Sequence, residues 1–319
     1  MAKLDADLLV VGAGPAGLTA AQYGARANLR VLVVEQFAPG GQAALIDALE
    51  NYPGNIGLKD GKGNVIAKPR TGFDLMQDMH DQAVAFGASF ASETVSELKK
   101  EDGAFAAVLA DGRILKASAV ILATGASHRR LCVPGEDAYS GRGVSYCATC
   151  DGAFFKGRKI FVVGGGDAAC DGAQYLSRLS SQVILVHRRD RFRAQPALAA
   201  RVMRNQNIKV RFNTIVKEIK GERKLSSVVL QQDGKTSAES ADAVFIFAGM
   251  VPRSALVSQG EMQARMDADG YVVTDQTMAS SIPGLYVAGD VRSGAFRQVV
   301  VAAGEGAVAA HSAAEFIGI

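Results

Sequence analysis

Short apolar runs recur along the chain, and small residues, most often glycine, follow several of them. The first two runs are Asp7–Val11 and Val31–Val34, and an alanine-rich stretch of helical spacing extends between them to about Ala27. Apolar runs of this length, bounded by turn residues, are typical of buried strands. The alternation of strand, helix and strand predicts an α/β fold.

The turn after the first apolar run has the sequence Gly12-Ala13-Gly14-Pro15-Ala16-Gly17, and the second run ends in an acid, Glu35. Strand, glycine turn, helix, strand and acid together make the complete pattern of a dinucleotide-binding unit. The first glycine permits the tight turn, the second lets the backbone approach a pyrophosphate, and the third lets the helix pack on the strand. A carboxylate at Glu35 suits free ribose hydroxyls and repels a 2′-phosphate, so we expect FAD at this unit.

The same construction recurs in the second half of the chain. A predicted strand, Lys159–Val163, leads into the turn Gly164-Gly165-Gly166-Asp167-Ala168-Ala169, a predicted helix, Cys170–Leu179, and another strand, Val183–Val186. The spacing from Gly164 to His187 equals the spacing from Gly12 to Glu35. An internal repeat of this kind predicts two nucleotide sites.

The two copies differ after their second strand. Where the first copy has Glu35, the second has His187-Arg188-Arg189-Asp190-Arg191-Phe192-Arg193, and Ala169 replaces the third glycine. Guanidinium groups bind phosphate through bidentate, charge-assisted hydrogen bonds, so the second unit is predicted to bind NADPH. The alternative interpretation of the arginines is a solvated, basic start of a helix.

Two further apolar runs bracket the second copy and indicate that it is inserted into the first domain. Ala119–Leu122 ends at Ala123-Thr124-Gly125, and Val244–Phe247 ends at Ala248-Gly249. We therefore predict an FAD-binding domain from residues 1–124 and 250–319 and an NADPH-binding domain from residues 125–249. The predicted hinges lie near Thr124–Ser127 and Ala248–Pro252.

The remaining segments are predicted from local pattern. An acid after a strand and a small-residue turn, as in Ala288-Gly289-Asp290, is suited to a ribityl hydroxyl. The predictions are turns at Gly40-Gly41-Gln42 and Asn51-Tyr52-Pro53-Gly54, an exposed loop over Ile56–Arg70, a helix over Phe73–Phe86, a hairpin or meander over Ser96–Leu115 with a turn at Asp111-Gly112, a strand over Ile282–Val287, and an alanine-rich helix after Arg297-Gln298.

The candidate reaction centre is Cys147-Ala148-Thr149-Cys150-Asp151, upstream of the second glycine turn. Two thiols at this spacing close a small reversible disulfide, in which the first can attack and the second resolve. A structural zinc site is the alternative, but tetrahedral zinc takes four ligands, usually from two paired motifs. The other cysteines, Cys132 and Cys170, are unpaired, and we expect both to pack in cores as small apolar residues.

Composition narrows the class of protein. With 319 residues, 48% of them apolar, the chain is long enough for about two domains, and its net charge of +3 indicates neither a nucleic acid nor a membrane partner. Four cysteines, of which two have redox spacing, do not make a secreted disulfide scaffold. The chain passes from Met1-Ala2-Lys3 almost directly into its first strand, without the pattern of a signal peptide, so a cytoplasmic protein is expected.

Taken together, these motifs resemble the low-molecular-weight thioredoxin reductases of the pyridine nucleotide–disulfide oxidoreductase family. The resemblance covers nearly the whole chain, and its most specific part is the Cys-Ala-Thr-Cys-Asp string. Ile56–Arg70 departs from it by being longer than the family segment. The matching pieces are Gly12–Gly17 with Glu35, Gly40-Gly41-Gln42, Glu50-Asn51-Tyr52-Pro53-Gly54, Ala123-Thr124-Gly125, Cys147–Asp151, Gly164–Ala169, His187-Arg188-Arg189 with Arg193, and Gly289-Asp290 with Arg297-Gln298.

The resemblance implies a fold of two dinucleotide-binding domains, each Rossmann-like with three ββα layers, and an electron path from NADPH through FAD to the Cys147–Cys150 disulfide and then to thioredoxin. It also implies that Cys150 faces the flavin, that Cys147 attacks the partner, and that the protein is a homodimer. Asp151 is placed to exchange protons with the thiols, although an Asp-Gly turn would also explain it. Because the nicotinamide and the disulfide must reach the flavin in turn, the inserted domain is expected to rotate about the hinges.

Motifs and resemblance together predict three catalytic residues, no metal ligand and two sets of cofactor-binding residues. The catalytic residues are Cys147, Cys150 and Asp151. The set for FAD is Gly12, Gly14, Pro15, Ala16, Gly17, Glu35, Gly41, Gln42, Asn51, Ala123, Thr124, Gly125, Gly289, Asp290, Arg297 and Gln298, and the set for NADPH is Gly164, Gly166, Asp167, Ala168, His187, Arg188, Arg189 and Arg193.

Other functions remain open at this point. One is a related flavin-dependent disulfide reductase that serves a peroxiredoxin-type or other small dithiol partner. Another is a dithiol oxidase that passes electrons to oxygen, although such oxidases tend to lose the arginine motif that this chain retains. A third is a non-enzymatic flavin-binding redox sensor whose thiol pair responds to oxidation.

Overall fold

The computed structural model describes residues 4–46, 49, 51–55, 58–59, 65–67, 70–101, 103–260 and 262–319, with the backbone alone for 58–59 and 65–67. The chain forms two compact units. The discontinuous unit comprises Met1–Ser127 and Val251–Ile319, and the inserted unit comprises His128–Met250. The sequence analysis had placed the two changes of domain after residues 124 and 249.

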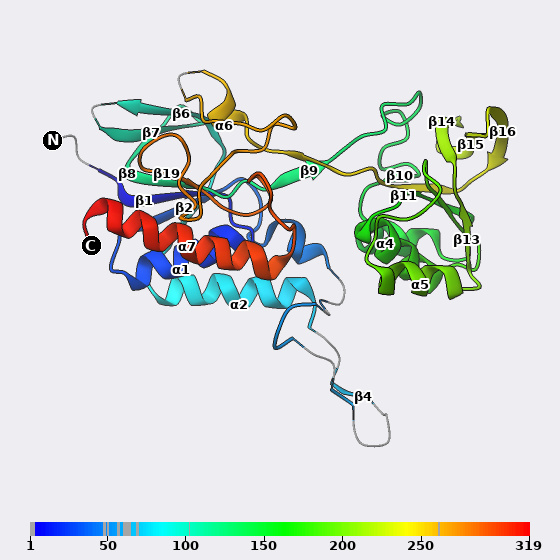
Figure 1. Ribbon diagram of the computed structural model, residues 1–319, viewed down its shortest axis with the longest axis horizontal. Helices are drawn as coiled ribbons and strands as arrows, with labels where there is room; N and C mark the ends of the chain where they lie inside the picture. Colours follow the sequence, from blue (N-terminus) through cyan, green and yellow to red (C-terminus); the bar gives the residue numbers. More distant parts are fainter. Residues whose placement is uncertain are drawn as a thin grey trace. The chain divides into compact units, whose positions relative to one another are not determined.

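A mixed seven-stranded sheet lies at the centre of the discontinuous unit, in the order β5-β2-β1-β8-β7-β6, and β19 also pairs with β8 (Figure 1). The helices α1, α2 and α7 lie along one side of this sheet. The elements of the unit are β1 (Ala6–Val11), α1 (Pro15–Arg26), β2 (Val31–Glu35), the 3₁₀ helix η1 (Gly41–Leu45), β3 (Leu58–Lys59), β4 (Val65–Ala67), α2 (Gly72–Ala85), β5 (Ser89–Ser92), β6 (Val95–Glu101), β7 (Ala104–Leu109), β8 (Ile114–Leu122), α6 (Ala255–Ser258), β19 (Leu285–Val287) and α7 (Val299–Ile317).

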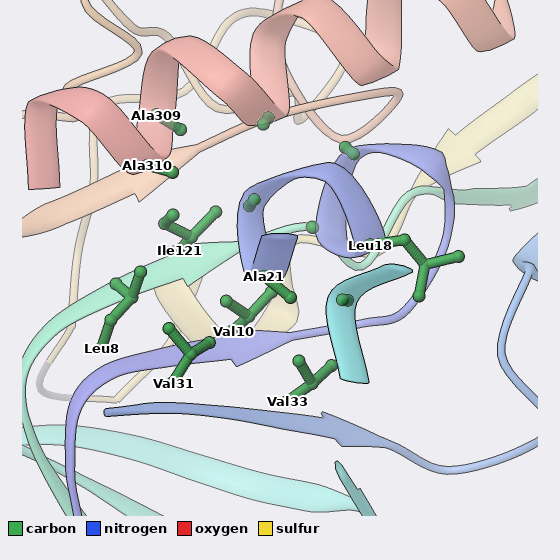
Figure 2. Close-up of a cluster of buried hydrophobic side chains, with 14 of the residues drawn as sticks. Leu8, Val10, Leu18, Ala21, Val31, Val33, Ile121, Ala309 and Ala310 are labelled. Atoms are coloured by element: carbon green, nitrogen blue, oxygen red, sulfur yellow. The ribbon is translucent and has the colours of Figure 1, made fainter. Parts of the chain in front are cut away.

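The central strands of this sheet bury both of their faces. Along β1, Leu8 and Val10 belong to the core under the helices, and Leu9 and Val11 belong to the core on the opposite face. Figure 2 shows the strand side chains of the first core together with residues of α1 and α7. Because successive side chains of a strand point to opposite faces, a strand covered on both sides must be apolar throughout. This explains the continuous runs in the sequence.

Two predicted elements of this unit differ from those observed. Ser96–Leu115 and Ala119–Leu122 were treated separately, but β8 is a single strand that continues through both. The backbone continues because Ala117 pairs with β7 on one side and with β1 on the other, although polar Lys116 and Ser118 break the apolar pattern. The predicted strand Ile282–Val287 is shorter, since β19 begins at Leu285.

The segment Ile56–Arg70, predicted to be an exposed loop, lies largely outside the described residues. Of its backbone, β3 and β4 are described, and they pair as antiparallel strands. At its end, Arg70 is exposed and forms an ion pair with Asp78 of α2.

The inserted unit contains a parallel five-stranded sheet, in the order β10-β17-β11-β12-β13, and a separate antiparallel sheet, β14-β15-β16. One core contains residues of α4 and α5, and a second core joins the two sheets, which gives the three layers of a ββα arrangement. The elements are β10 (Val144–Ser145), α3 (Ala148–Asp151), the 3₁₀ helix η2 (Gly152–Phe155), β11 (Ile160–Gly164), α4 (Asp167–Ser177), β12 (Val183–Val186), α5 (Pro196–Arg204), β13 (Ile208–Arg211), β14 (Thr214–Gly221), β15 (Leu225–Gln232), β16 (Lys235–Ser240) and β17 (Ala243–Phe247). Where the chain passes between the units, β9 (Ala126–His128) pairs with β18 (Met250–Pro252).

Helix α4 begins earlier than the sequence analysis predicted, at Asp167 rather than at Cys170. Gly166 is the N-cap residue, in extended conformation, and Asp167 occupies the first turn. An acid in the first turn is favourable because it interacts with the unpaired N–H groups and the positive end of the helix dipole. The apolar pattern misses this start because the first turn of the helix is polar.

Helices α1 and α7 pack closely against each other in the discontinuous unit, and this contact depends on glycine. A Cβ atom at Gly306 would lie 2.1 Å from the carbonyl oxygen of Ala16, whereas a Cβ atom at Gly304, on the exposed face of α7, would have no atom within 4 Å. Since the obstructing atom belongs to the backbone of α1, it cannot rotate aside.

These two glycines form a matched pair of test positions on one helix. We expect Gly306→Ala to lower the free energy of unfolding by about 1–3 kcal/mol through overpacking. Gly304→Ala should leave it unchanged or raise it by about 0.5–1 kcal/mol, because alanine favours the helix. Thermal unfolding of both variants checks this, and equal stability of the two would contradict the proposed contact.

Candidate functional site

The first glycine turn is formed by backbone contacts that leave no room for side chains. Gly12 has a φ of +102°, and a Cβ atom there would lie 2.4 Å from the carbonyl oxygen of Ala123. A Cβ atom at Gly17 would lie 1.9 Å from the oxygen of Gly12. Gly14 has no neighbour within 4 Å of its Cβ position, so the middle of the turn is open for a ligand. Each of the three glycines thus has the environment that the dinucleotide pattern requires.

Glu35 lies at the end of β2 beside this turn. Its carboxylate accepts hydrogen bonds from the backbone N–H of Ala13, at 2.8 Å, and of Phe37, at 3.0 Å. Each carboxylate oxygen has further acceptor capacity after one such bond. The side chain is therefore held at the rim of the glycine turn and can accept hydrogen bonds from the hydroxyl groups of a ribose.

The η1 segment covers the turn from another side. The N–H of Gly40 donates to the oxygen of Ala13 at 2.7 Å, and a Cβ atom at Gly41 would lie 3.3 Å from the Cα of Gly14. The side-chain amide of Gln42 donates to the oxygen of Ala126. Gly41 and Gln42, predicted from the sequence as cofactor contacts, therefore lie next to the first glycine turn and the end of the Ala123–Gly125 segment.

Other predicted residues of the discontinuous unit also come together from distant parts of the sequence. The side-chain amide of Asn51 donates to Gln298 Oε1 at 2.7 Å, and Thr124 Oγ1 donates to the oxygen of Arg253 at 2.7 Å. Gly289, with a φ of +79°, would place a Cβ atom 3.1 Å from that of Ala16. Glu50, which belongs to the same motif as Asn51, lies outside the described residues.

Asp290 is a partly buried carboxylate at the start of the loop after β19. Burial raises its pKa, the Arg297 guanidinium lowers it, and the nearby Glu305 carboxylate raises it further. The guanidinium of Arg297 also lies over the ring of Tyr271, at 4.6 Å from the centroid. Asp290 can therefore act as a hydrogen-bonding group toward a polar ligand in a site of low polarity.

The sequence analysis missed Glu305, which lies buried in α7. Its carboxylate accepts the N–H of Gly289 at 2.8 Å and pairs with Arg292. Within the described residues, Nε of Arg292 is buried and has no partner. A carboxylate between two glycines in the apolar first half of this helix was the signal that could have identified it. Glu305 holds the Gly289 turn against α1.

The second glycine turn, in the inserted unit, resembles the first, except that a side chain, His187, packs against its middle glycine. Gly164 has a φ of +153°, and a Cβ atom there would lie 2.6 Å from the oxygen of Phe247. Gly166 is open, with no atom within 4 Å of its Cβ position. A Cβ atom at Gly165 would lie 2.3 Å from the ring of His187, so this glycine is required by a side chain rather than by the backbone.

His187 packs under the turn instead of extending into solvent. It is 5% exposed, lies near-parallel to the Phe192 ring, and has an Nε2 atom without a partner among the described residues. Burial lowers its pKa, and the charges of Arg193, Arg189 and Arg188 lower it further. The imidazole is therefore neutral near pH 7, and it supports the glycine turn from below.

The arginine cluster that follows His187 is exposed and folds back to the glycine turn. The backbone N–H of Arg193 donates to the oxygen of Gly165 at 2.7 Å. Asp167 accepts the backbone and side-chain N–H groups of Gln195, at 2.8 and 2.9 Å. Among the described residues, no acid forms an ion pair with an arginine of this cluster, which comprises Arg188, Arg189, Arg191 and Arg193. Ala168, in the first turn of α4, is also exposed. The turn and the start of α4 are therefore open to solvent on the side where the arginine cluster folds back.

The two cysteines of the candidate reaction centre are joined as a disulfide across the single turn of α3. Cys147 is half-buried, Cys150 is exposed, and Asp151 is half-buried. The backbone N–H of Cys150 donates to Cys147 Sγ at 3.2 Å, and Thr149 Oγ1 lies 3.4 Å from the same sulfur. A partner protein can reach this disulfide from solvent, and its two sulfurs have different surroundings.

The disulfide helix packs directly on α4, the helix that begins at the second glycine turn. A Cβ atom at Gly152 would lie 2.9 Å from Leu176 Cδ2, and a Cβ atom at Gly172 would lie 3.6 Å from that of Ala148. Beside the disulfide, Phe154 is 80% exposed, and the sequence analysis did not identify it. The disulfide and the nucleotide turn therefore share one rigid support.

The prediction for the other two cysteines is correct for one and wrong for the other. Cys170 is buried in the core beneath α4, and burial raises its pKa to about 12. Cys132 is exposed. The cause is the buried Glu136 carboxylate, which accepts the N–H groups of Leu131, Cys132 and Val133 and so curls this loop with its Cys132 side chain outward, at a φ of +57°.

The residues that the structure describes contain neither a cluster of metal ligands nor a helix that could span a membrane. No group of three or more histidine, cysteine, aspartate or glutamate residues there is arranged to hold a metal ion. In the same residues, no helix has the length and apolar character needed to cross a membrane.

Comparison with known proteins extends these observations. The family model of the pyridine nucleotide-disulphide oxidoreductases matches residues 6–306. The thioredoxin reductase of Treponema pallidum is 50% identical over 317 residues, which is 99% of this chain and 98% of that protein. The crystal structure of Lactococcus lactis thioredoxin reductase in its FR conformation is 36% identical, with a TM-score of 0.90 over 98% of this chain and 99% of that one. The thioredoxin reductase of T. acidophilum has a TM-score of 0.88 at 32% identity, over 98% and 99% of the two chains.

Proposed function

This chain belongs to the pyridine nucleotide-disulphide oxidoreductase family, and we propose that it is an NADPH-dependent thioredoxin reductase. The observation that carries the proposal is the position of the accessible Cys147–Cys150 disulfide. It lies on α3, which packs on α4, and α4 begins at the second glycine turn, to which the arginine cluster is hydrogen-bonded through its backbone. Relatives named thioredoxin reductase that match nearly the whole chain at 41–50% identity support it.

In this proposal the discontinuous unit holds FAD. The open position at Gly14 fits a pyrophosphate, Glu35 fits a ribose, and Asp290 fits a polar group of the ribityl chain. The contacts of Gly41, Gln42, Asn51 and Gln298 place further polar groups around the same turn. FAD, when bound, supplies the chemistry that passes two electrons from a nicotinamide to a disulfide.

The inserted unit holds NADPH. Gly166 is open to the pyrophosphate at the N-terminus of α4. Arg188, Arg189 and Arg193 bind the 2′-phosphate, and the packed His187 keeps the turn that presents them in place. Glu35 and the arginines therefore direct the two dinucleotides to different units by the sign of their charge.

The chain's own thiols complete the reaction with the protein partner. Cys147, as a thiolate, attacks one sulfur of the thioredoxin disulfide, and the second thioredoxin sulfur leaves as a thiolate and takes up a proton. Cys150 then attacks Cys147, which releases the reduced partner and restores the Cys147–Cys150 bond. Asp151 exchanges protons with these thiols. The exposed ring of Phe154 offers an apolar contact to the docked partner.

The proposal also includes a homodimer in the cytoplasm, which sedimentation velocity and localisation in cells test directly. It includes a rotation of the inserted unit about its two connecting strands, because that unit carries both the disulfide and the nicotinamide site. Each unit has its own core, and their only covalent connections are the chain segments containing β9 and β18, as rotation requires.

The first test concerns the thiols. We expect Cys147→Ser to retain reduction of the flavin by NADPH and to lose turnover with oxidised thioredoxin by at least about a thousandfold, because the nucleophile is absent. Cys132→Ser is the control, since Cys132 is exposed but lies outside the redox pair, and it should keep full activity. Anaerobic flavin absorbance and steady-state NADPH consumption measure the two reactions.

Turnover that survives in Cys147→Ser excludes the proposed relay. Turnover of the parent chain with a peroxiredoxin-type protein but not with thioredoxin favours the related reductase instead.

The second test concerns the nicotinamide site. The double variant Arg188→Ala, Arg189→Ala should raise the KM for NADPH by roughly 10- to 100-fold, because charge-assisted hydrogen bonds to the 2′-phosphate are lost. The KM for NADH should stay the same, because NADH has no 2′-phosphate, and this makes it a control within each protein. An NADPH KM equal to that of the parent chain shows that the phosphate binds elsewhere.

The third test concerns rotation. A covalent cross-link between the two units should preserve one half-reaction and stop the other, because a single arrangement cannot bring both the nicotinamide and the disulfide to the flavin. Rapid-reaction absorbance separates the two half-reactions, and cleaving the cross-link should restore turnover. Unchanged turnover in the linked protein argues against rotation.

A further inference from the structure

The sulfur of Cys147 has two hydrogen-bond donors within its own turn. The backbone N–H of Cys150 lies 3.2 Å from Cys147 Sγ, and the hydroxyl of Thr149 lies 3.4 Å from it. A disulfide sulfur carries no hydrogen, so the Thr149 hydroxyl is the donor in this pair. Both donors belong to the three residues that follow Cys147, and they remain beside the sulfur for as long as this turn persists.

The sulfur of Cys150 has no such donor. Over the described part of the chain, no hydrogen bond reaches Cys150 Sγ, and Cys150 is the more exposed of the two residues. Exposure alone would favour Cys150 as the thiol that meets a partner. Reactivity in disulfide exchange, however, follows the thiolate, and hydrogen bonds to the charged form stabilise it. The two cysteines are therefore chemically unequal.

We propose that Thr149 is a catalytic residue of disulfide exchange, and that its hydroxyl, by donating to the Cys147 thiolate, makes Cys147 the sulfur that attacks the partner. The inference deepens the proposed function and rests on it. In the attack on the partner, the Cys147 thiolate forms a bond to one sulfur of the partner disulfide. The S–S bond of the partner breaks, and the electron pair of that bond goes to the second partner sulfur. The Thr149 hydroxyl keeps its proton throughout this step. When Cys150 displaces the partner and the Cys147–Cys150 disulfide forms again, the hydroxyl again donates to Cys147 Sγ as in the present structure.

A neighbouring hydroxyl separates this role from mere support of the backbone. Ser145 Oγ accepts the N–H of Cys147 at 3.1 Å and donates to the carbonyl oxygen of Cys147 at 3.2 Å. It thus contacts the main chain of Cys147 without a hydrogen bond to the sulfur. Removing the Ser145 hydroxyl disturbs the position of Cys147, whereas removing the Thr149 hydroxyl takes away a donor to the thiolate.

The experiment measures the thiolate directly and does not depend on turnover. In a Cys150→Ser background, reduced with a phosphine that is then removed, the rate of iodoacetamide alkylation is followed against pH by peptide-resolved mass spectrometry. Thr149→Val should move the midpoint for Cys147 upward by about one pH unit, because a hydrogen bond to a charged group is lost. Thr149→Ser should restore the parental midpoint, and Ser145→Ala should leave it unchanged.

Two cysteines of the same chain serve as internal references. Exposed Cys132 should show the same alkylation profile in every variant. Buried Cys170, whose pKa burial raises to about 12, should stay unlabelled as long as the inserted unit is folded. If Thr149→Val exposes Cys170, Thr149→Ala takes its place in the comparison.

An unchanged Cys147 midpoint in the folded variant that lacks the hydroxyl overturns the proposal, and so does an equal shift in Ser145→Ala. Both results are independent of the proposed function. Steady NADPH consumption by the unmodified chain with oxidised thioredoxin tests that function separately. If NADPH consumption with thioredoxin is absent while the Cys147 alkylation midpoint shifts as expected, the role of Thr149 toward the Cys147 thiolate is supported and thioredoxin is excluded as the partner.

Discussion

Close backbone contact at glycine is the constraint on which both nucleotide turns depend. In the first turn, the carbonyl oxygens of Ala123 and Gly12 occupy the space where side chains of Gly12 and Gly17 would lie. The same constraint recurs on the far side of α1, where Gly306 meets Ala16. The first turn of α1 therefore meets the end of the sheet at Gly17 and α7 at Ala16, and its N-cap residue is Gly14, the open position of the turn. A side chain at any of these contacts would displace the helix and the ligand position with it.

The second copy shows how far the constraint can be relaxed. Ala169 takes the place of the third glycine, and its Cβ lies 2.7 Å from the Cβ position of Gly164. The Cβ of Ala169 fits there because Gly164 has no side chain. The space beneath the turn is then filled by the ring of His187, which requires glycine at position 165. One residue thus both supports the turn and begins the arginine cluster, and this links the shape of the site to its charge.

The order of the strands in the sheets was not predicted, whereas the positions of the two glycine turns, of Glu35 and the arginine cluster after the next strand, and of the thiol pair follow from spacing in the sequence. These features depend on neighbours in sequence.

Contacts between residues that are distant in the sequence were missed. In the sequence, Glu305 is an acid in an apolar stretch, and only the structure shows that Gly289 donates to it. Gly165 is likewise one of three equivalent glycines until His187 is seen to pack on it. Cys132 was placed in a core as a small apolar residue, yet a buried carboxylate four residues later turns it outward. Strand β8 was divided because polar side chains interrupt a pattern that the backbone pairing ignores.

The surroundings of the disulfide are stiff on both sides, which explains why its two sulfurs can differ within so short a segment. On one side, Tyr146 donates from its hydroxyl to the buried Glu136 at 2.6 Å, and burial together with that carboxylate raises the pKa of Tyr146 to about 12, so the hydroxyl keeps its proton at any physiological pH. Glu136 in turn binds three consecutive backbone N–H groups of the loop that follows β9. On the other side, Gly152 packs against Leu176 of α4 without space for a side chain. Because the turn is held at both ends, we expect its backbone and its internal donors to stay in place when the S–S bond opens. The hydroxyl of Thr149 then remains near Cys147 through both redox states, and the difference between the two thiols is a property of the fold.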